Sequence, residues 1–168
     1  MTLLYAHPYD ISAQGFLFNS VEQYEAQAKK LRNDFGDPVE EFEIQFVDGE
    51  LIDAELAKAF ALNQGTFAQF LELVENWDDN QKTRFIIAVG ECGYGEEQVI
   101  DDPESVDLDI YELDSLKDLA EQFVEEGLFG DIPERLQFYI DYDAIARDLA
   151  VDYAQTTIDN THLIYRCG

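Results

Sequence analysis

The 168-residue sequence is poor in positive charge. It has ten lysine and arginine residues against 37 aspartates and glutamates, which gives a formal net charge of −27. Long-range repulsion therefore opposes direct binding to nucleic acid or to an anionic membrane surface. The expected partners are basic proteins or cations.

Cysteine is also scarce. Cys92 and Cys167 are the only two, which is too few for a disulfide framework, and no CxxC spacing indicates metal or redox chemistry. We therefore expect each cysteine to be a free thiol.

Long apolar runs are missing. No stretch of about 18 apolar residues could form a membrane span. The N-terminus lacks the basic and apolar pattern of a signal peptide. These absences predict a cytoplasmic protein without a membrane partner.

The chemical motifs of enzymes are missing as well. His7 and His162 have no nearby Cys, Ser or second His in the sequence, so packing or turn roles are favoured. The segment Gly93–Gly95 lacks the surroundings of a phosphate loop. Acid pairs such as Asp107 and Asp109 lack the central Gly and final Glu of a calcium loop. We predict no catalytic residue, no metal site and no cofactor.

What the sequence does contain is a folded acidic stretch. The stretch from Glu91 to Glu134 contains sixteen acidic residues and only one basic residue, Lys117. Apolar residues such as Leu119 and Phe123 recur there at helical spacing, so the stretch is not a disordered tail. Crowded carboxylates cost stability through self-repulsion. We therefore expect them to serve the function.

Hydrophobic periodicity predicts an α+β fold. The predicted strands cover residues 3–5, 15–18, 42–47, 107–112, 154–158 and 162–166. The predicted helices cover residues 20–36, 53–60, 66–77, 80–91 and 115–126, with a last helix that opens at Asp141 or Asp143 and runs to Tyr153. The segment 80–91 also suits a strand by its β-branched content, and its setting between helices favours a helix.

Local signals set the ends of these elements. Ser20, Asp53, Thr66 and Ser115 are predicted N-caps, and Gly36 is the predicted stop of the first helix. An Asp159-Asn160 turn is predicted to join the last two strands as a hairpin.

Two phrases of the C-terminal half resemble a known family. They are Asp114 to Gly130 (DSLKDLAEQFVEEGLFG) and Tyr139 to Leu149 (YIDYDAIARDL). Both are similar to the C-terminal part of the ArdA family of antirestriction proteins. The closing hairpin with Tyr165-Arg166 fits too, and the order of elements, the length and the acidity agree over essentially the whole chain.

The resemblance implies an architecture and a function. Such proteins are carried by mobile genetic elements and form an elongated chain of three small domains with a DNA-mimic architecture. The expected domains are 1–50 (β-sheet plus helix), 51–105 (helical) and 106–168 (α+β). The protein would imitate bent B-form DNA and occupy the DNA groove of type I restriction-modification enzymes, without a catalytic site or a cofactor.

The quantity of charge suits this role. Duplex DNA presents one negative charge per roughly 1.7 Å of axis. The net charge of −27 would then correspond to roughly 46 Å, or roughly thirteen base pairs for each chain, if all charges lay on one ridge.

The candidate phosphate surrogates are acids on the polar sides of their elements. They are Asp101, Asp102, Glu104, Asp107, Asp109, Asp118, Glu121, Glu125, Glu126, Asp141, Asp143, Asp148 and Asp152. For any single acid, a solvated surface or a helix cap is the favoured role. The functional hypothesis is therefore collective.

The resemblance also implies a homodimer formed through the C-terminal unit. Tyr139, Tyr142 and Leu149 are the candidate interface residues, although tyrosines in such positions more often belong to the core of their own domain. Three other functions stay open. They are an enzyme, a halophile-adapted acidic domain, and an acidic binding module for another basic protein.

Overall fold

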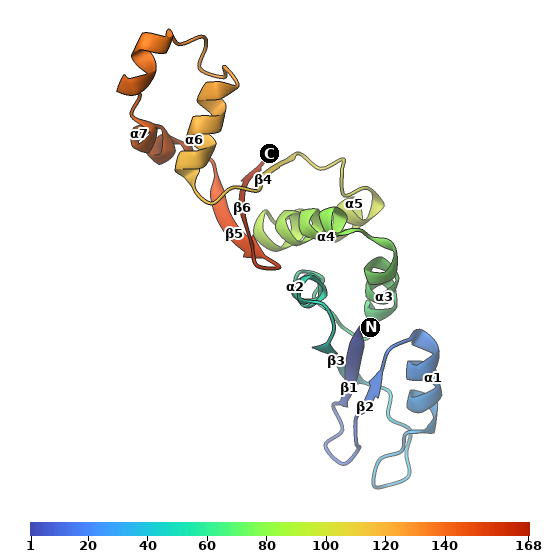
Figure 1. The fold of residues 1–168 in the computed structure, drawn as a ribbon. Helices are drawn as coiled ribbons and strands as arrows, with labels where there is room; N and C mark the ends of the chain where they lie inside the picture. The colour runs from blue at the N-terminus through green and yellow to red at the C-terminus, as the bar shows by residue number, and fades with distance from the viewer. The chain divides into compact units, whose positions relative to one another are not determined.

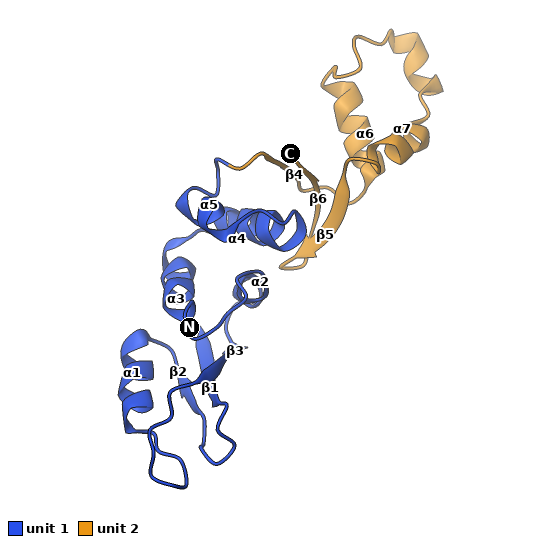
Figure 2. Ribbon diagram, turned by 180° about the vertical axis from the view of Figure 1, so that it is seen from behind, with its two compact units in different colours: residues 1–105 blue, residues 106–168 orange.

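The computed structural model describes residues 1–168, and these form two compact units, Met1–Ser105 (unit 1) and Val106–Gly168 (unit 2) (Figure 2). Each unit combines helices with one small antiparallel sheet, so the predicted mixed α+β class is confirmed. The division into three domains stays a prediction.

Unit 1 begins with a three-stranded sheet (Figure 1). Strands β1 (Leu3–Pro8), β2 (Phe16–Phe18) and β3 (Phe42–Asp48) lie in the order β2-β1-β3, and both pairings are antiparallel. Successive side chains of a strand point to opposite faces. Buried Leu4 and Phe42 accordingly alternate with exposed or half-buried neighbours, as the alternation in the sequence predicts.

The first helix, α1, covers Val21–Lys30. Its predicted start is confirmed, and its predicted end is wrong. Ser20 caps it, because the Gln23 amide donates to the Ser20 hydroxyl at 3.2 Å. The helix ends at Lys30 and not at Gly36. The physical reason is Asn33, whose side-chain oxygen accepts hydrogen bonds from the backbone amides of the two residues Phe35 and Asp37 and so holds a turn.

The helices of unit 1 follow the sheet. They are α2 (Leu51–Ala59), α3 (Phe67–Asn76), α4 (Asp79–Phe85), the π-helical turn η1 (Ile86–Glu91) and α5 (Glu96–Asp101). The helical prediction for residues 80–91 is confirmed. A capping box between Asp78 and Gln81 starts α4.

Of two predicted caps in unit 1, Asp53 is wrong, whereas Thr66 takes the N-cap position as predicted but makes no side-chain capping bond. Asp53 lies inside α2, where it is buried and paired with Lys82, and Glu50 takes the N-cap position. Thr66 precedes α3 without a capping bond, because its hydroxyl accepts from the Asn63 amide at 3.0 Å. In both cases another partner holds the polar side chain.

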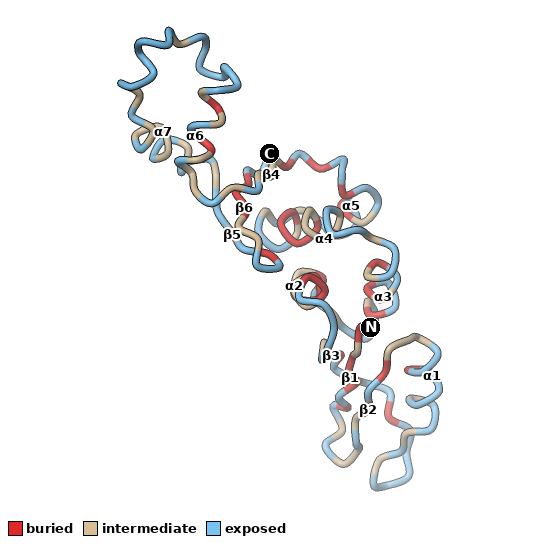
Figure 3. Tube along the Cα trace, viewed as in Figure 1, coloured by how far each residue is buried: buried red, intermediate tan, exposed pale blue.

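Aromatic rings fill the interior of unit 1. Phe18 and Tyr24 lie against Phe67 of α3, with ring centroids 5.2 and 4.5 Å away. In the same unit, the ring centroid of Phe46 on β3 lies 6.5 Å from the ring centroid of Phe70 on α3. The first sheet and the helices therefore share one apolar core, as the buried positions along both indicate (Figure 3).

Unit 2 also contains a three-stranded antiparallel sheet. Strands β4 (Leu108–Tyr111), β5 (Ala154–Ile158) and β6 (Thr161–Cys167) lie in the order β4-β6-β5. Asp159 and Asn160 join β5 to β6 with φ of 50° and 61°. Two consecutive left-handed residues are typical of a tight hairpin turn, so the predicted hairpin is confirmed.

The helices of unit 2 are α6 (Leu116–Glu125), the 3₁₀ segment η2 (Glu134–Tyr139) and α7 (Tyr142–Leu149). Ser115 caps α6 as predicted, and Asp141 caps α7. Helix α7 ends at Leu149 and not at Tyr153. Tyr153 instead packs against the core cluster of Leu119, Phe123 and Ile164 and leads directly into β5.

Two further findings concern the cysteines and the possibility of a membrane-spanning helix. Neither Cys92 nor Cys167 is a free thiol, which corrects the prediction. No helix has both the length and the apolar character needed to cross a membrane.

Candidate functional site

The predicted phosphate surrogates lie on both units. Unit 1 holds Asp101 at the end of α5, Asp102 at its C-cap and Glu104 in the following loop. In unit 2, Asp107 precedes β4, Asp109 lies on it, and Asp152 precedes β5. The remaining seven are on α6 or at its C-cap (Asp118, Glu121, Glu125, Glu126) and on α7 or at its N-cap (Asp141, Asp143, Asp148).

Nearly all of these carboxylates face solvent. Eleven of the thirteen are exposed, and Asp109 and Asp118 are half-buried. Unit 1 has 22 acidic and six basic residues, a net charge of −16, and unit 2 has 15 and four, a net charge of −11. Each unit is therefore strongly anionic by itself.

Helix α6 gathers its acids on one face. An α-helix turns about 100° per residue, which places Asp118, Glu121 and Glu125 within an arc of about 60°. The buried residues Leu119, Ala120 and Phe123 occupy the opposite side. The amphipathic pattern that packs α6 onto the sheet thus also fixes a row of three carboxylates toward solvent.

Strand β4 is less anionic than its sequence predicts. Asp109 lies opposite Arg166 in the β4–β6 register, and the Arg166 guanidinium donates to Asp109 Oδ2 at 2.6 Å. The hydrogen bond that Arg166 donates to Asp109 raises the pKa of Arg166, and the guanidinium carbon also lies 5.5 Å from the centroid of the Tyr153 ring. Asp109 is therefore locally neutralised.

Several other candidates have structural partners. Asp141 accepts from the Ala144 amide at 3.0 Å, and Asp102 accepts from the Glu104 amide at 3.1 Å. Ionic or side-chain contacts engage Asp143, 3.6 Å from Lys117 Nζ, and Glu126, 3.1 Å from Gln122 Nε2. Seven candidates make no side-chain hydrogen bond or ion pair: Asp101, Glu104, Asp118, Glu121, Glu125, Asp148 and Asp152.

A comparison with known families decides what this anionic protein is. The family model described as antirestriction protein (ArdA) matches residues 12–163. The chain belongs to the ArdA family. It is therefore an antirestriction protein, and its family is not one of known enzymes. A comparison with curated proteins gave no match.

The family match covers the predicted dimer residues, which have different surroundings. In this ArdA-family chain, Tyr139 is 83% exposed. Tyr142 and Leu149 are half-buried, and Leu149 packs against the core of unit 2. Only Tyr139 of the three presents most of its side chain to solvent.

Further exposed apolar side chains lie in the same segment as Tyr139, and reasoning from the sequence did not single them out. The segment between α6 and α7 is almost entirely exposed (Figure 3). Its large apolar side chains include Leu128, Phe129, Leu136 and Phe138, of which Phe138 is 93% exposed. Their lack of helical or strand periodicity could have identified them as residues without a place in the core.

Proposed function

We propose that this protein blocks restriction by imitating B-form DNA and occupying the DNA-binding groove of a type I restriction-modification enzyme. It would act in the cytoplasm as the product of a mobile genetic element, without catalysis and without a cofactor. The observation that carries this function is the exposure of eleven candidate carboxylates on two folded units of net charge −16 and −11.

Electrostatics explains why such a surface would compete with DNA. An acidic surface holds cations and a groove lined by lysine and arginine holds anions, and both sets of counterions are released when the two surfaces bind. Association would then be fast and would weaken as salt rises. Because the protein offers no base edges, recognition would rest on the spacing of its carboxylates, as phosphate contacts position a protein on DNA without reading sequence.

Helix α6 provides the most direct local test. We expect the triple variant Asp118→Asn, Glu121→Gln, Glu125→Gln to inhibit a type I enzyme about tenfold less well, since three contacts at the protein surface together are worth about 1.5 kcal/mol. The measurement is protection of unmodified DNA from cleavage as a function of protein concentration.

A matched triple variant controls for net charge. Glu112→Gln, Asp131→Asn and Glu134→Gln remove three exposed acids of the same unit that are not among the candidates. This control should stay within about twofold of the parent protein. Equal losses for both triple variants would show that total charge, and not the α6 row, determines inhibition.

We further propose that the protein is a homodimer formed through unit 2, with three small domains in each chain. The exposed apolar side chains in the segment between α6 and α7 support this, because exposed apolar residues that gather in a patch mark interaction sites. A two-fold interface uses the same patch on both chains, and two chains would double the anionic length offered to an enzyme that reads two half-sites. Tyr139 would belong to this interface, with Tyr142 and Leu149 at its base.

The dimer can be tested by removing two exposed rings. The variant Phe138→Ser, Tyr139→Ser is expected to weaken dimerisation about a hundredfold, because buried aromatic residues dominate interfaces. Analytical ultracentrifugation should show the parent as a dimer at micromolar concentration and the variant as a monomer. The control, Ile11→Ser with Phe35→Ser, removes two equally exposed apolar residues from unit 1, at 101% and 84% exposure. A monomeric parent protein would contradict the proposed dimer.

A further inference from the structure

The connection between β3 and α2 contains the exposed pair Asp48-Gly49. It is the only place in the chain where a glycine follows an aspartate or an asparagine. Asp48 is the last residue of β3, and Glu50 takes the N-cap position of α2. The pair therefore forms the joint between the first sheet and the helices of unit 1, and the antirestriction function assigns it no role.

The Asp48 carboxyl group lies against the backbone amide that follows it. The Gly49 amide donates a hydrogen bond to Asp48 Oδ1 at 3.0 Å. Asp48 forms no ion pair, so no basic side chain draws the carboxyl group away. A bond between the Gly49 nitrogen and the Asp48 side-chain carboxyl carbon would close a five-membered ring. The hydrogen bond thus holds together two groups that can react with each other.

The fold requires glycine at position 49. Its φ is 155°, and a Cβ added there would lie 2.9 Å from a ring carbon of Phe46. Packing of β3 therefore excludes a side chain at this position. The missing side chain also leaves the Gly49 nitrogen unhindered. The residue that the fold needs after Asp48 is the one that obstructs ring closure least.

The backbone at Asp48 lies at an irregular end of the sheet. Asp48 is opposite Leu3 in the β1–β3 register, and the register shifts between Leu3 and Leu4. Such an irregularity disrupts the regular ladder of hydrogen bonds. Ring closure needs a rotation of the Asp48 backbone, and this rotation is easier where the ladder ends than within it.

We propose that Asp48-Gly49 is a site of spontaneous isomerisation of aspartate to isoaspartate. The Gly49 nitrogen bonds to the Asp48 carboxyl carbon and loses its proton. One carboxyl oxygen takes up this proton and one from solvent and leaves as water, which gives a succinimide ring. Water then opens the ring at either carbonyl. Cleavage of the original peptide bond leaves isoaspartate, and cleavage of the new bond restores aspartate.

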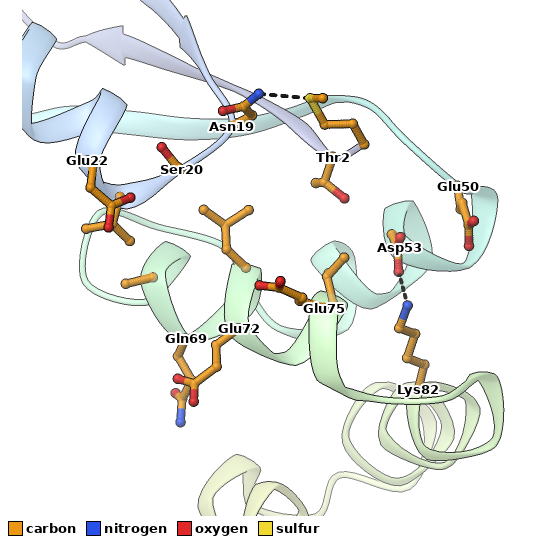
Figure 4. A pocket seen from close by; sticks show the side chains of 15 residues that line it. Thr2, Asn19, Ser20, Glu22, Glu50, Asp53, Gln69, Glu72, Glu75 and Lys82 are labelled. Carbon is orange, nitrogen blue, oxygen red and sulfur yellow. Dashed lines mark hydrogen bonds and ion pairs between the residues drawn. The ribbon is translucent and has the colours of Figure 1, made fainter.

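Isoaspartate changes the joint between β3 and α2 without changing the charge. Its main chain passes through the side-chain carbons, so one additional atom separates the two elements. Both elements are held in place, because β3 is paired with β1 and Asp53 of α2 lies 2.8 Å from Lys82 Nζ (Figure 4). The added atom therefore lowers the stability of unit 1. This inference does not rest on the proposed function, since no restriction enzyme takes part.

Incubation of the full chain at neutral pH in water enriched in a heavy oxygen isotope tests the site. Each opening of the ring by water adds one heavy oxygen atom at Asp48. Mass spectrometry of the tryptic fragment Asn33–Lys58, with electron-transfer fragmentation, locates the label and the isoaspartyl bond. The fragment also contains Asp34, Asp37 and Asp53, each of which should gain at most about a tenth of the label.

Two variants test the ring closure itself. Asp48→Glu keeps the charge but needs a six-membered ring, so labelling should fall about tenfold or more. Asp48→Asn releases ammonia in place of water and should lose its amide faster than the parent gains label. Circular dichroism verifies that each variant is folded. Label spread equally over the aspartates of the fragment, isoaspartate that forms only in urea, or an Asp48→Asn protein that keeps its amide would overturn the proposal.

The effect on unit 1 is measured on the isoaspartyl protein after its chromatographic separation from the parent. Its urea unfolding, followed by the fluorescence of Trp77 in unit 1, should have a lower midpoint than that of the parent incubated for the same time. An unchanged midpoint would overturn the assigned strain at the β3–α2 joint.

Discussion

Replacing Lys82 with methionine is expected to lower the free energy of unfolding of unit 1 by about 3–5 kcal/mol. The Lys82 and Asp53 side chains are 6% and 5% exposed, and their charged atoms lie 2.8 Å apart. Removal of the lysine charge leaves Asp53 buried without a countercharge. The loss is large because an unpaired buried charge is far more costly than the pair is stabilising.

Fluorescence of Trp77 during urea unfolding is the appropriate measurement. Trp77 is the only tryptophan, lies in unit 1 and packs against Phe85 at 5.7 Å between ring centroids. It therefore reports unfolding of the unit that contains the ion pair.

Two controls separate charge from shape in this experiment. Lys58→Met alters an exposed lysine on α2 and should change stability by less than about 0.5 kcal/mol. The double variant Asp53→Leu, Lys82→Met replaces both charges and should recover most of the loss. A Lys82→Met protein as stable as Lys58→Met would refute the account of the buried pair.

Salt is expected to have the second large effect. If about six carboxylates take the place of phosphates, inhibition of a type I enzyme should weaken about a thousandfold between about 50 mM and about 200 mM salt. The physical reason is that binding releases the cations held by the carboxylates and the anions held by the enzyme's basic groove, and this release is less favourable when salt is abundant. Inhibition constants measured over a salt series provide the slope.

The fold must be followed under the same conditions. The protein should keep its circular dichroism spectrum at low salt and inhibit best there. A halophile-adapted domain would instead unfold at low salt, because its carboxylates need screening. Inhibition that does not change over the salt series would contradict a binding mode based on charged contacts.

Local patterns in the sequence were sufficient for much of the fold. Alternation at Phe42 and Ile44 predicted β3, and the hydroxyl groups of Ser20 and Ser115 predicted two helix starts. The Asp159-Asn160 pair predicted a hairpin because both residue types tolerate positive φ. Each of these signals lies within the element that it specifies.

The wrong predictions involve side chains whose partners are distant in the sequence, or side chains that compete with the helix for nearby backbone hydrogen bonds. Asp53 has the residue type and the position of a helix cap, but Lys82, far along the chain, holds it in the core. Asn33 ends α1 early through its own side-chain bonds, before Gly36 is reached. No periodicity within one element could reveal either arrangement.

For the candidate site too, features set within one element could be predicted from the sequence, and features set by distant partners could not. Exposure of the acids follows from the amphipathic pattern, which correctly turns Glu121 and Glu125 of α6 to solvent. The pairing of Asp109 with Arg166 depends on strand register between residues 57 positions apart. The charge of a surface could therefore be predicted from the sequence, and the cancellation of individual charges could not.

Steady-state competition with DNA tests the central claim most directly. A type I enzyme is assayed for cleavage over a range of DNA concentrations at several fixed concentrations of this protein. A protein that occupies the DNA groove should raise the KM for DNA in proportion to its own concentration and leave kcat unchanged. A fall in kcat at constant KM, or a stable complex of enzyme, DNA and this protein together, would contradict it.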